Sequence, residues 1–509
     1  MQVGNTGFDL FCTRLSACFV AGFMMLSPFQ VWPSAVDRLR QDLGEVFANT
    51  KFEHAIWGAH VESVDRGEVL FDLNNHKLLM PASNMKLLVG AAALQLLGPD
   101  FCFETELLAG GPILEGVLQG SLVVRGGGDP SIGGRFHKGD LLFTFREWAR
   151  QLRQKGIRRI QGDVVGDDNL FDDIPYGQGW QWDDLPYWYA AEVTALSFND
   201  NCIDLIFEPG PKIGSPAVIT ASPQVDYVKI RNKTVTVKNL PRGSDAIREI
   251  VYRRGDSDRV ITVEGPVLAK QRRFREWAAV PNPTLFTVSM FREVLRREGI
   301  EVSGQAIDID DLPPPLRKES LQSLFVHLSP PLSDLLPVLL GRSQNLYAEM
   351  FLKYLGAKVG GGGSAKTGAK VVGDFLRRLG VPEEEFAIAD GSGLSRENLV
   401  TPAAFCALLK GMAKSPHIDV FKASLPTPGE KGTLAGRMKT APTNGRVWAK
   451  TGSIGGVRSL SGYIQSRDKE LFAFSFIVNN DQSEGTRANR LQDEACRLIA
   501  GFSRAESQK

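Results

Sequence analysis

The stretch that most constrains the fold of this chain is residues 80–94. After Pro81, which suits a first helical turn because its missing N–H costs nothing there, small and apolar residues continue to Asp100 with Lys86 as the only charge. A helix that is apolar nearly all round is a core helix. Ser83 and Lys86 are three residues apart, so the pattern places both on one face of this buried helix.

A lysine in the first turn of a buried helix needs an explanation, because basic groups are disfavoured near the positive end of the helix dipole. Burial lowers the pKa of an ammonium group, and the resulting neutral amine can take the proton of a neighbouring hydroxyl. Ser83 would then be a nucleophile. The alternative is a capping serine with a lysine that extends to solvent. The same pattern recurs at Ser466 and Lys469, in a predicted turn between strands, so context must decide.

Length and composition set the broad class. A chain of 509 residues exceeds the size, roughly 250–300 residues, at which a single core stops growing, so we expect more than one domain. Hydrophobic residues make up 43% and charged residues 23%, as in globular proteins. The net charge is +1 and no basic stripe is present, which argues against nucleic acid as a partner.

The first 35 residues differ from the rest of the chain. Residues 15–32 are uncharged and mostly apolar, follow Arg14, and precede the small residues Ser34 and Ala35. This order predicts a cleaved secretory signal peptide over residues 1–35 and therefore an exported protein. A retained anchor is the alternative, although polar residues interrupt the run and it is short for a membrane span. Peripheral membrane association stays open.

Export would permit disulfide bonds. The mature chain has four cysteines, Cys102, Cys202, Cys406 and Cys496, which allow three pairings that the sequence cannot distinguish. Buried unpaired thiols are the alternative.

Two segments with different secondary-structure patterns follow. Residues 36–48 predict an amphipathic helix, and residues 55–64 and 68–73 predict a hairpin that precedes the Ser83 helix. Residues 101–310 contain short alternating runs broken by glycine and proline, which predicts β-rich structure with helices at 143–155 and 283–298. Acidic residues at 163–168 lie in a predicted turn, where carboxylates are usually solvated or capping, so no metal site is predicted.

Helical patterns return after residue 324. Residues 332–340 and 345–355 predict two helices that bracket a short link at 341–344. Residues 360–367 are close to a phosphate-binding loop, but Ala365 replaces the second required glycine and the stretch follows a helix, so a link is predicted. Three strands at 447–453, 459–465 and 471–478 and a final helix at 485–500 complete the chain.

Three short motifs occur in a fixed order along the chain. They are Ser83-x-x-Lys86, Ser343-x-Asn345 and Lys450-Thr451-Gly452, the motif set of the active-site-serine penicillin-recognising enzymes. The second and third motifs also have decoys, at Ser197-x-Asn199 and Lys366-Thr367-Gly368. Context separates them, because the first motif opens a buried helix, the second lies in a tight link between helices and the third lies on a strand.

Further segments extend this pattern beyond the motifs: residues 80–94, 124–130, 195–201, 343–349, 390–396 and 432–434. With them, the chain resembles the D-alanyl-D-alanine carboxypeptidases of the class C low-molecular-mass penicillin-binding proteins, peptidase family S13. The resemblance covers most of residues 40–500 and is weakest around 226–280. In this family, the long gap between Lys86 and Ser343 holds inserted domains.

The resemblance implies an α+β fold with a serine β-lactamase/transpeptidase-like catalytic domain, an antiparallel sheet flanked by helices. This domain would comprise residues 36–100 and 311–509, with residues 101–310 forming one or more inserted β-rich domains. It also implies a periplasmic carboxypeptidase, with DD-endopeptidase activity possible, that acts on peptidoglycan stem peptides and is inhibited by β-lactam antibiotics. No metal or organic cofactor is implied, and the oligomeric state is left open.

The resemblance also implies a role for each motif residue. Ser83 attacks the D-Ala-D-Ala bond to form an acyl-enzyme, Lys86 is the base, Ser343 relays a proton to the departing D-alanine, and Asn345 holds the acyl chain. The substrate carboxylate would be bound by residues of one strand, namely Lys450, Thr451, Gly452 and Ser453. The backbone N–H groups of Ser83 and Ser453 would form the oxyanion hole. Strand alternation points Lys450 away from Thr451 and Ser453, so its ammonium would have to reach around to the cleft or act through its electrostatic field.

Two alternative functions are compatible with parts of this pattern. A β-lactamase or esterase on the same fold would share all three motifs and differ in how quickly water reaches the acyl-enzyme. A non-catalytic wall-binding or sensor protein would not require Ser83, Lys86 and Ser343 together.

Overall fold

The structure is a computed structural model that describes residues 34–48, 52–224, 226–240, 247, 249–255, 258–312, 321–483 and 486–505. The predicted signal peptide lies outside these ranges except for Ser34 and Ala35, which cap and begin the first helix. Among the described residues, none of the helices has the length and apolar character needed to span a bilayer.

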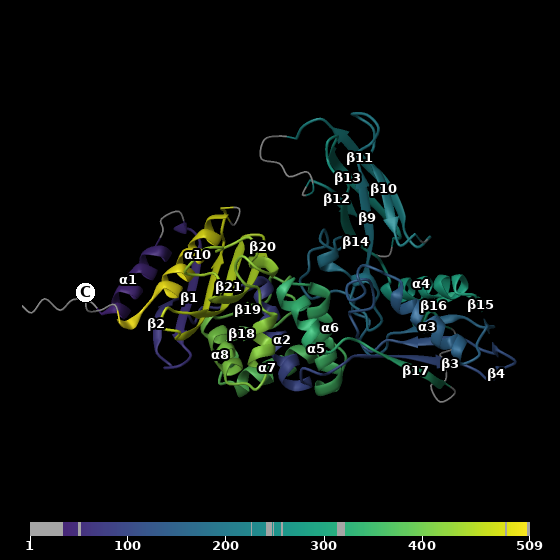
Figure 1. The fold of residues 1–509 in the computed structure, drawn as a ribbon, viewed down its shortest axis with the longest axis horizontal. Helices are drawn as coiled ribbons and strands as arrows, with labels where there is room; N and C mark the ends of the chain where they lie inside the picture. The colour runs from purple at the N-terminus through teal and green to yellow at the C-terminus, as the bar shows by residue number, and fades with distance from the viewer. Residues whose placement is uncertain are drawn as a thin grey trace, which may run out of the picture.

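The centre of the catalytic part is a five-stranded antiparallel sheet with the order β2-β1-β22-β21-β20. The strands come from both ends of the chain: β1 Ile56–Ser63, β2 Val69–Leu73, β20 Val447–Ile454, β21 Val457–Gln465 and β22 Leu471–Asn479. Helices α1 (Ala35–Phe47) and α10 (Thr486–Gly501) cover one face (Figure 1). The predicted hairpins and terminal helices are therefore confirmed.

A helical layer packs on the other face of this sheet. It contains α2 Met85–Leu97, α5 Leu332–Leu336, α6 Asn345–Leu355, α7 Ala365–Arg378, α8 Pro402–Ala413 and α9 Ile418–Ser424, with a small β18 Phe386–Ala387 and β19 Leu399–Val400 pair. All residues of α2 from Met85 to Leu94 are buried, including Lys86, as predicted for a core helix. Residues 360–367 run from a π-helical turn into α7, which confirms a link between helices.

The region around Ser83 differs from the predicted regular helix. Ser83 lies in a single 3-10 turn, Ala82–Asn84, and the α-helix begins only at Met85. The turn follows from Ala82, whose φ of 47° is left-handed and cannot continue a right-handed helix. Ser83 and Lys86 still share one side of this junction.

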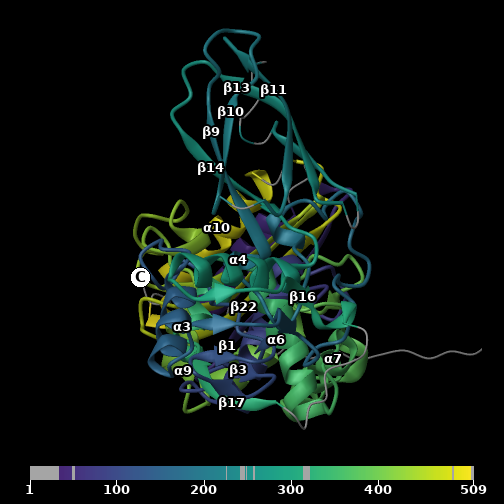
Figure 2. The ribbon, with the colours of Figure 1, turned by 90° about the vertical axis from the view of Figure 1, so that its right-hand side faces the viewer.

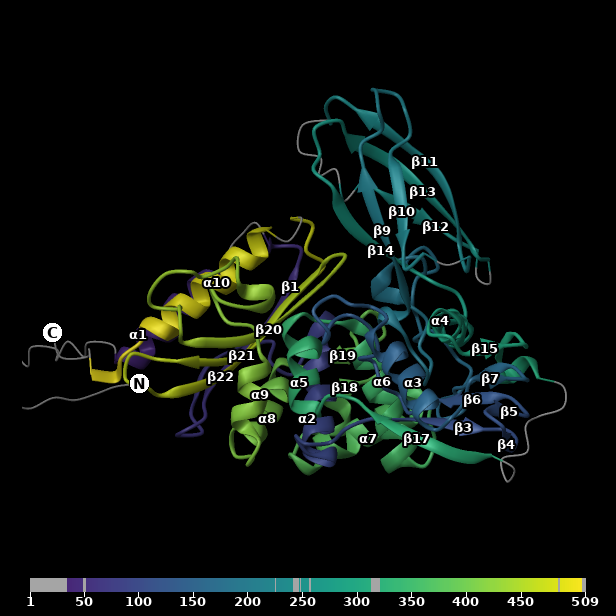
Figure 3. The same cartoon turned by 45° about the vertical axis from the view of Figure 1, so that its right-hand side comes forward.

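The segment between α2 and α5 forms a second body (Figures 1 and 3). Its main sheet has the order β16-β8-β6-β3-β17. The strands are β3 Glu104–Ala109, β6 Leu122–Arg125, β8 Val164–Asp167, β16 Ala306–Asp308 and β17 Gln322–Leu328. Helices α3 (Phe143–Gln154) and α4 (Pro283–Arg297) belong to the same body, as predicted. A small sheet, β15-β7-β5-β4, contains β4 Ile113–Leu114, β5 Val117–Leu118, β7 Arg159–Ile160 and β15 Glu301–Val302.

Two three-stranded sheets form an arm that projects from this body (Figures 1 and 2). One has the order β10-β9-β14 and the other β11-β13-β12. Their bounds are β9 Cys202–Glu208, β10 Val218–Ser222, β11 Lys229–Val237, β12 Val251–Arg253, β13 Val260–Leu268 and β14 Phe274–Ala279. Strand β11 pairs in parallel along its whole length with β13.

Strand β17 lies beyond the expected end of the inserted segment at residue 310. Strand β17 pairs antiparallel with β3 and forms an edge of the main sheet of the insert. We therefore propose that the insert comprises about residues 101–328, and that the catalytic domain comprises residues 36–100 and 329–509.

Candidate active site

The three motifs meet at the junction of the central sheet and the helical layer. The Nζ atom of Lys86 donates to Ser83 Oγ at 3.1 Å and to Asn345 Oδ1 at 2.7 Å. The Nζ atom of Lys450 donates to Ser343 Oγ at 2.8 Å. The site thus contains two pairs of a serine hydroxyl and a lysine amine: Ser83 with Lys86, and Ser343 with Lys450.

Lys86 is fully buried, and burial lowers its pKa to about 7. The buried carboxylates of Asp390 and Glu349 oppose this shift. Near neutral pH, a large fraction of Lys86 is therefore the unprotonated amine, which can accept the proton of Ser83 Oγ.

Two buried carboxylates hold the loop that completes the Lys86 environment. Lys86 donates to the carbonyl oxygen of Ser392 at 2.7 Å. Glu349 on α6 accepts from the backbone N–H of Gly391 and Ser392, at 2.9 and 2.7 Å. Asp390 accepts from the N–H of Gly393 at 2.7 Å and from Trp180 Nε1 at 2.9 Å.

Lys450 reaches the cleft more directly than expected. Side chains alternate along β20, and Lys450 is buried whereas Ser453 is exposed. The buried face is, however, the face that packs on the nucleophile turn. A Cβ atom at Gly452 would lie 3.0 Å from the backbone nitrogen of Ser83, so only glycine allows this approach. The expectation that the Lys450 side chain must reach around the strand is therefore wrong.

Burial also lowers the pKa of Lys450 well below its ordinary value, and the neighbouring Lys86 adds to this effect. Besides Ser343, the amine donates to the carbonyl oxygen of Thr451 at 2.7 Å. The Thr451 hydroxyl donates to Thr433 Oγ1 at 2.6 Å, which places a second threonine next to the predicted carboxylate site.

Two residues at the centre have left-handed backbone conformations. Ala82 precedes the nucleophile with φ of 47°, and Ser343 itself has φ of 64°. For residues other than glycine, such conformations cost on the order of 1–3 kcal/mol and occur mainly where the surrounding structure imposes them. Here they orient the two hydroxyl groups toward the two lysines.

Sequence reasoning placed the motif residues and missed those that support them. Glu349, Asp390, Ser392 and Thr433 complete the site, and all four lie in the segments on which the family resemblance rests. Their presence in those segments was the only signal, since nothing in their spacing specified a contact with Lys86 or Thr451.

The decoy motifs lie elsewhere. Ser466 follows β21 in the turn before β22, Lys366 lies in the first turn of α7, and Ser197 lies in the insert just before the 3-10 turn Asn199–Asn201. None of the three bonds with Lys86 or Lys450 among the described residues.

The structure also shows the surroundings of the cysteines and of the acidic residues in the insert. Among the described residues, the four cysteines form no disulfide bond. Cys202, Cys406 and Cys496 are buried, as in the alternative of buried thiols, whereas Cys102 is only partly buried. Asp168 lies with Asp308 and Asp310 in the insert, and burial raises the Asp168 pKa to about 7. Thr284 donates to Asp168 at 2.5 Å, which satisfies one oxygen without a metal ion. This acidic cluster alone identifies no metal site.

The comparisons with known proteins agree with this geometry. The model of the D-Ala-D-Ala carboxypeptidase 3 (S13) family matches residues 39–498. The chain belongs to this family. The resemblance deduced from the motifs is thereby confirmed.

Individual relatives cover most of the chain. The D-alanyl-D-alanine carboxypeptidase of Actinomadura sp. (strain R39) is 33% identical over 91% of this chain and 85% of its own length. The D-alanyl-D-alanine carboxypeptidase DacB of Haemophilus influenzae is 28% identical over 83% of this chain and 85% of its own length. The crystal structure of penicillin binding protein 4 (dacB) from Haemophilus influenzae matches with a TM-score of 0.75 and 27% identity, over 90% of this chain and 97% of that one. The predicted α+β, transpeptidase-like fold class is confirmed.

Proposed function

We infer that this S13 family member is a serine-type D-Ala-D-Ala carboxypeptidase that acts on peptidoglycan stem peptides through an acyl-enzyme, with DD-endopeptidase activity on cross-linked peptides. The observation that carries this inference is the hydrogen bond between the Lys86 amine and the Ser83 hydroxyl. The amine is buried and its pKa is lowered. Binding alone would need no such pair, which weighs against the sensor alternative.

We propose that acylation proceeds as follows. Neutral Lys86 accepts the Ser83 proton while Ser83 Oγ bonds to the carbonyl carbon of the D-Ala-D-Ala peptide bond. The backbone N–H groups of Ser83 and Ser453 stabilise the oxyanion, which contributes about 3–4 kcal/mol per donor in proteases. Ser343, hydrogen-bonded to Lys450, relays the proton that Lys86 accepted to the departing amine, so that Lys86 and Ser343 return to their initial states as the C–N bond breaks. Asn345 orients both Lys86 and the acyl chain.

Recognition of the leaving residue depends on its free carboxylate. We propose that the negative charge of the bound carboxylate opposes the lowering of the Lys450 pKa, so that Lys450 is protonated in the complex and supplies the positive field. The Thr451 and Ser453 hydroxyl groups donate to the carboxylate. Water then hydrolyses the Ser83 ester and releases the shortened peptide. No step in this scheme requires a metal ion or an organic cofactor, because lysine amines and hydroxyl groups carry every proton.

We further propose that the chain is exported to the periplasm by residues 1–35. The family acts on cell-wall peptides outside the cytoplasm, and the charge and hydropathy order of this segment is typical of a signal peptide.

A fluorescent penicillin tests the proposed function and separates it from both alternatives. The protein is labelled, the excess reagent is removed, and the remaining label is followed over time. A carboxypeptidase of this class retains the label for many minutes, a β-lactamase loses it within seconds, and a wall-binding protein takes no label.

The pH dependence of acylation follows from the lowered pKa of Lys86. Below this pKa the ammonium cannot accept a proton, so the second-order rate constant of penicillin acylation should rise tenfold per pH unit and level off above about pH 7. Stopped-flow labelling from about pH 5 to about pH 9 measures this profile. A rate that keeps rising to the ordinary lysine pKa, or that does not change at all, would show that Lys86 is not the base.

Thr451→Val keeps the shape of the side chain and removes its hydroxyl. We expect kcat/KM to fall for a peptide that ends in D-Ala-D-Ala. The loss should correspond to about 1–3 kcal/mol of transition-state stabilisation, the cost of removing a donor to a charged group. The same peptide with an amidated terminus, already a poor substrate, should change little. Equal losses on both peptides would mean that Thr451 supports the fold through Thr433 and does not contact the carboxylate.

A further inference from the structure

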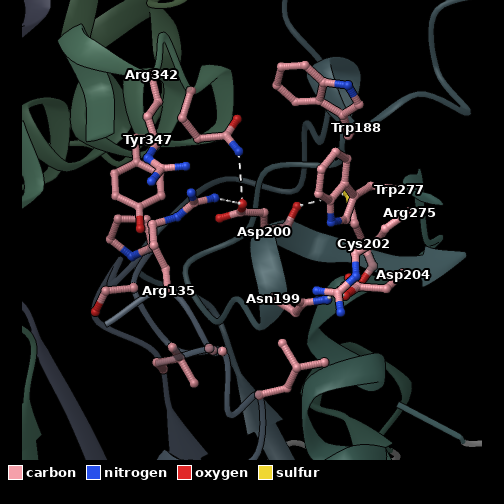
Figure 4. A pocket seen from close by; sticks show the side chains of 18 residues that line it. Arg135, Trp188, Asn199, Asp200, Cys202, Asp204, Arg275, Trp277, Arg342 and Tyr347 are labelled. Atoms are coloured by element: carbon pink, nitrogen blue, oxygen red, sulfur yellow. Dashed lines mark hydrogen bonds and ion pairs between the residues drawn. The ribbon is translucent and has the colours of Figure 1, made fainter. Parts of the chain in front are cut away.

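Beside the catalytic centre, the structure contains a cavity of about 380 Å³ between the helical layer and the insert (Figure 4). Arg342, Gln344 and Tyr347 line it from the catalytic part, and Trp188, Asp200 and Trp277 are among the residues that line it from the insert. A cavity of this size accommodates a peptide fragment of a few residues. The catalytic steps described above do not use it.

The cavity borders the link that carries the second motif. Arg342 and Gln344, which line the cavity, are the residues on either side of Ser343. Asn345 Nδ2 donates to the carbonyl oxygen of Tyr189 at 2.7 Å, and Tyr189 follows the lining residue Trp188. Since Ser343 protonates the departing amine in the proposed mechanism, its neighbours lie where the leaving group extends.

The charges in the cavity leave one cation uncompensated. Arg135 pairs with Asp200, and Arg275 Nη1 lies 3.3 Å from Asp204 Oδ2. Gln344 Nε2 also donates to Asp200, at 2.9 Å. Arg342 is exposed and makes no ion pair or side-chain hydrogen bond with any described residue.

Aromatic rings form the opposite wall. In Figure 4, Trp188 and Trp277 lie across the cavity from Arg342 and Tyr347. Trp277 on β14 is 41% exposed, which is unusual for so large an apolar side chain. Such rings bury the aliphatic part of a ligand whose polar groups bind elsewhere. The cavity therefore combines an apolar wall with an unpaired guanidinium group.

We propose that this cavity binds the leaving strand of a cross-linked peptide substrate, an inference that rests on the proposed function. A free carboxylate of the second peptide pairs with Arg342, and its aliphatic side chain packs against Trp188 and Trp277. Chemically, the reaction is the same amide hydrolysis. Ser83 Oγ bonds to the D-alanyl carbonyl carbon, the C–N bond to the second strand breaks, the leaving amine gains a proton, and water hydrolyses the ester. A single leaving D-alanine is too small to occupy this cavity.

The test compares kcat/KM for a soluble cross-linked peptide dimer with kcat/KM for the monomeric peptide that ends in D-Ala-D-Ala. Arg342→Gln should lower the ratio of these two constants by about tenfold, because it removes one charge-assisted hydrogen bond. Arg342→Lys, which keeps the charge, should restore part of the ratio. Trp277→Ala tests the opposite wall and should lower the ratio by about fivefold. Arg378→Gln, at an exposed position at the end of α7, is the matched control and should leave the ratio unchanged.

Any of the following three results would overturn the proposal. If Arg342→Gln lowers both constants by the same factor, Arg342 acts through Ser343 rather than on the second strand. If the ratio does not change, the cavity does not bind this part of the substrate. If the loss appears for both substrates, but only when they carry the disaccharide, the cavity binds the glycan instead. Failure of the proposed function is distinct, because the wild-type protein would then neither cleave the monomer nor bind penicillin covalently.

Discussion

Ser83→Ala should abolish covalent labelling by penicillin and lower carboxypeptidase kcat by at least about 10⁴-fold, as in other serine hydrolases that lose their nucleophile. After the substitution, the remaining side-chain or carbonyl partners of Lys86 are the Asn345 amide and the Ser392 carbonyl oxygen, and neither can attack a carbonyl carbon. Gel fluorescence of the labelled protein and steady-state hydrolysis of a D-Ala-D-Ala peptide measure the two effects.

The control for this variant is Ser466→Ala, the same substitution in the decoy motif. Ser466 lies in the turn between β21 and β22 and should retain full labelling. Circular dichroism and thermal unfolding of both variants show whether the fold persists. Labelling of Ser83→Ala at full stoichiometry would mean that another residue is the nucleophile, and the proposed mechanism would be wrong.

Lys86→Met should lower the rate of acylation by about 10³-fold, within the range that general-base catalysis contributes. Methionine fills a similar volume and has no basic atom, so Ser83 would keep its hydroxyl proton. The three hydrogen bonds of Lys86 are lost as well, which loosens Asn345 and the loop at Ser392. The rate constant of penicillin acylation, measured by stopped flow, isolates this step from deacylation.

Lys353→Met is the matched control, because Lys353 is also a buried lysine of the helical layer. Its Nζ atom donates to Asp172 Oδ1 at 2.6 Å and to the carbonyl oxygen of Ile174 at 2.7 Å, on the insert. This variant should lose thermal stability and keep its acylation rate at temperatures where it remains folded. If Lys86→Met acylates within about tenfold of the wild-type rate, a different group is the base.

The sequence was sufficient to predict the chemistry of the first motif but not its backbone. An uninterrupted apolar run around Lys86 indicated a buried amine, and the structure shows a fully buried side chain. Nothing in the run indicated that Ala82 would adopt a left-handed conformation, and in the folded protein its carbonyl group packs closely against the distant Gly393. Tertiary contacts therefore replaced the first helical turn by a 3-10 turn.

The same limit applies to strand pairing. Alternating residues indicated that the insert is rich in β-structure and marked some of its strands, such as β6 and β13, since a local pattern is sufficient for that purpose. Partner choice depends on distant residues, and β17 joins β3 across more than two hundred residues of sequence. That pairing is the reason why we propose that the insert ends at about residue 328 rather than at residue 310. Similarly, Glu349 could be assigned to α6 from the sequence, but its bonds with Gly391 and Ser392 required the folded loop.

The leaving-strand cavity could not be predicted from the sequence at all. Its walls come from separate segments, since Arg135, Trp188 and Trp277 lie in different parts of the insert and Arg342 lies before α6. No motif connects these residues, and each alone is an ordinary surface or partly buried side chain. Only their arrangement around one cavity, next to Ser343, suggests a shared role.

The most direct test of the account is to identify the acylated residue. The wild-type protein is treated with penicillin, digested at intervals and analysed by mass spectrometry. The proposed mechanism predicts a single penicilloyl adduct on Ser83, close to one per chain and stable for many minutes. An adduct on Ser343 or Ser466, or the absence of any adduct, would contradict it.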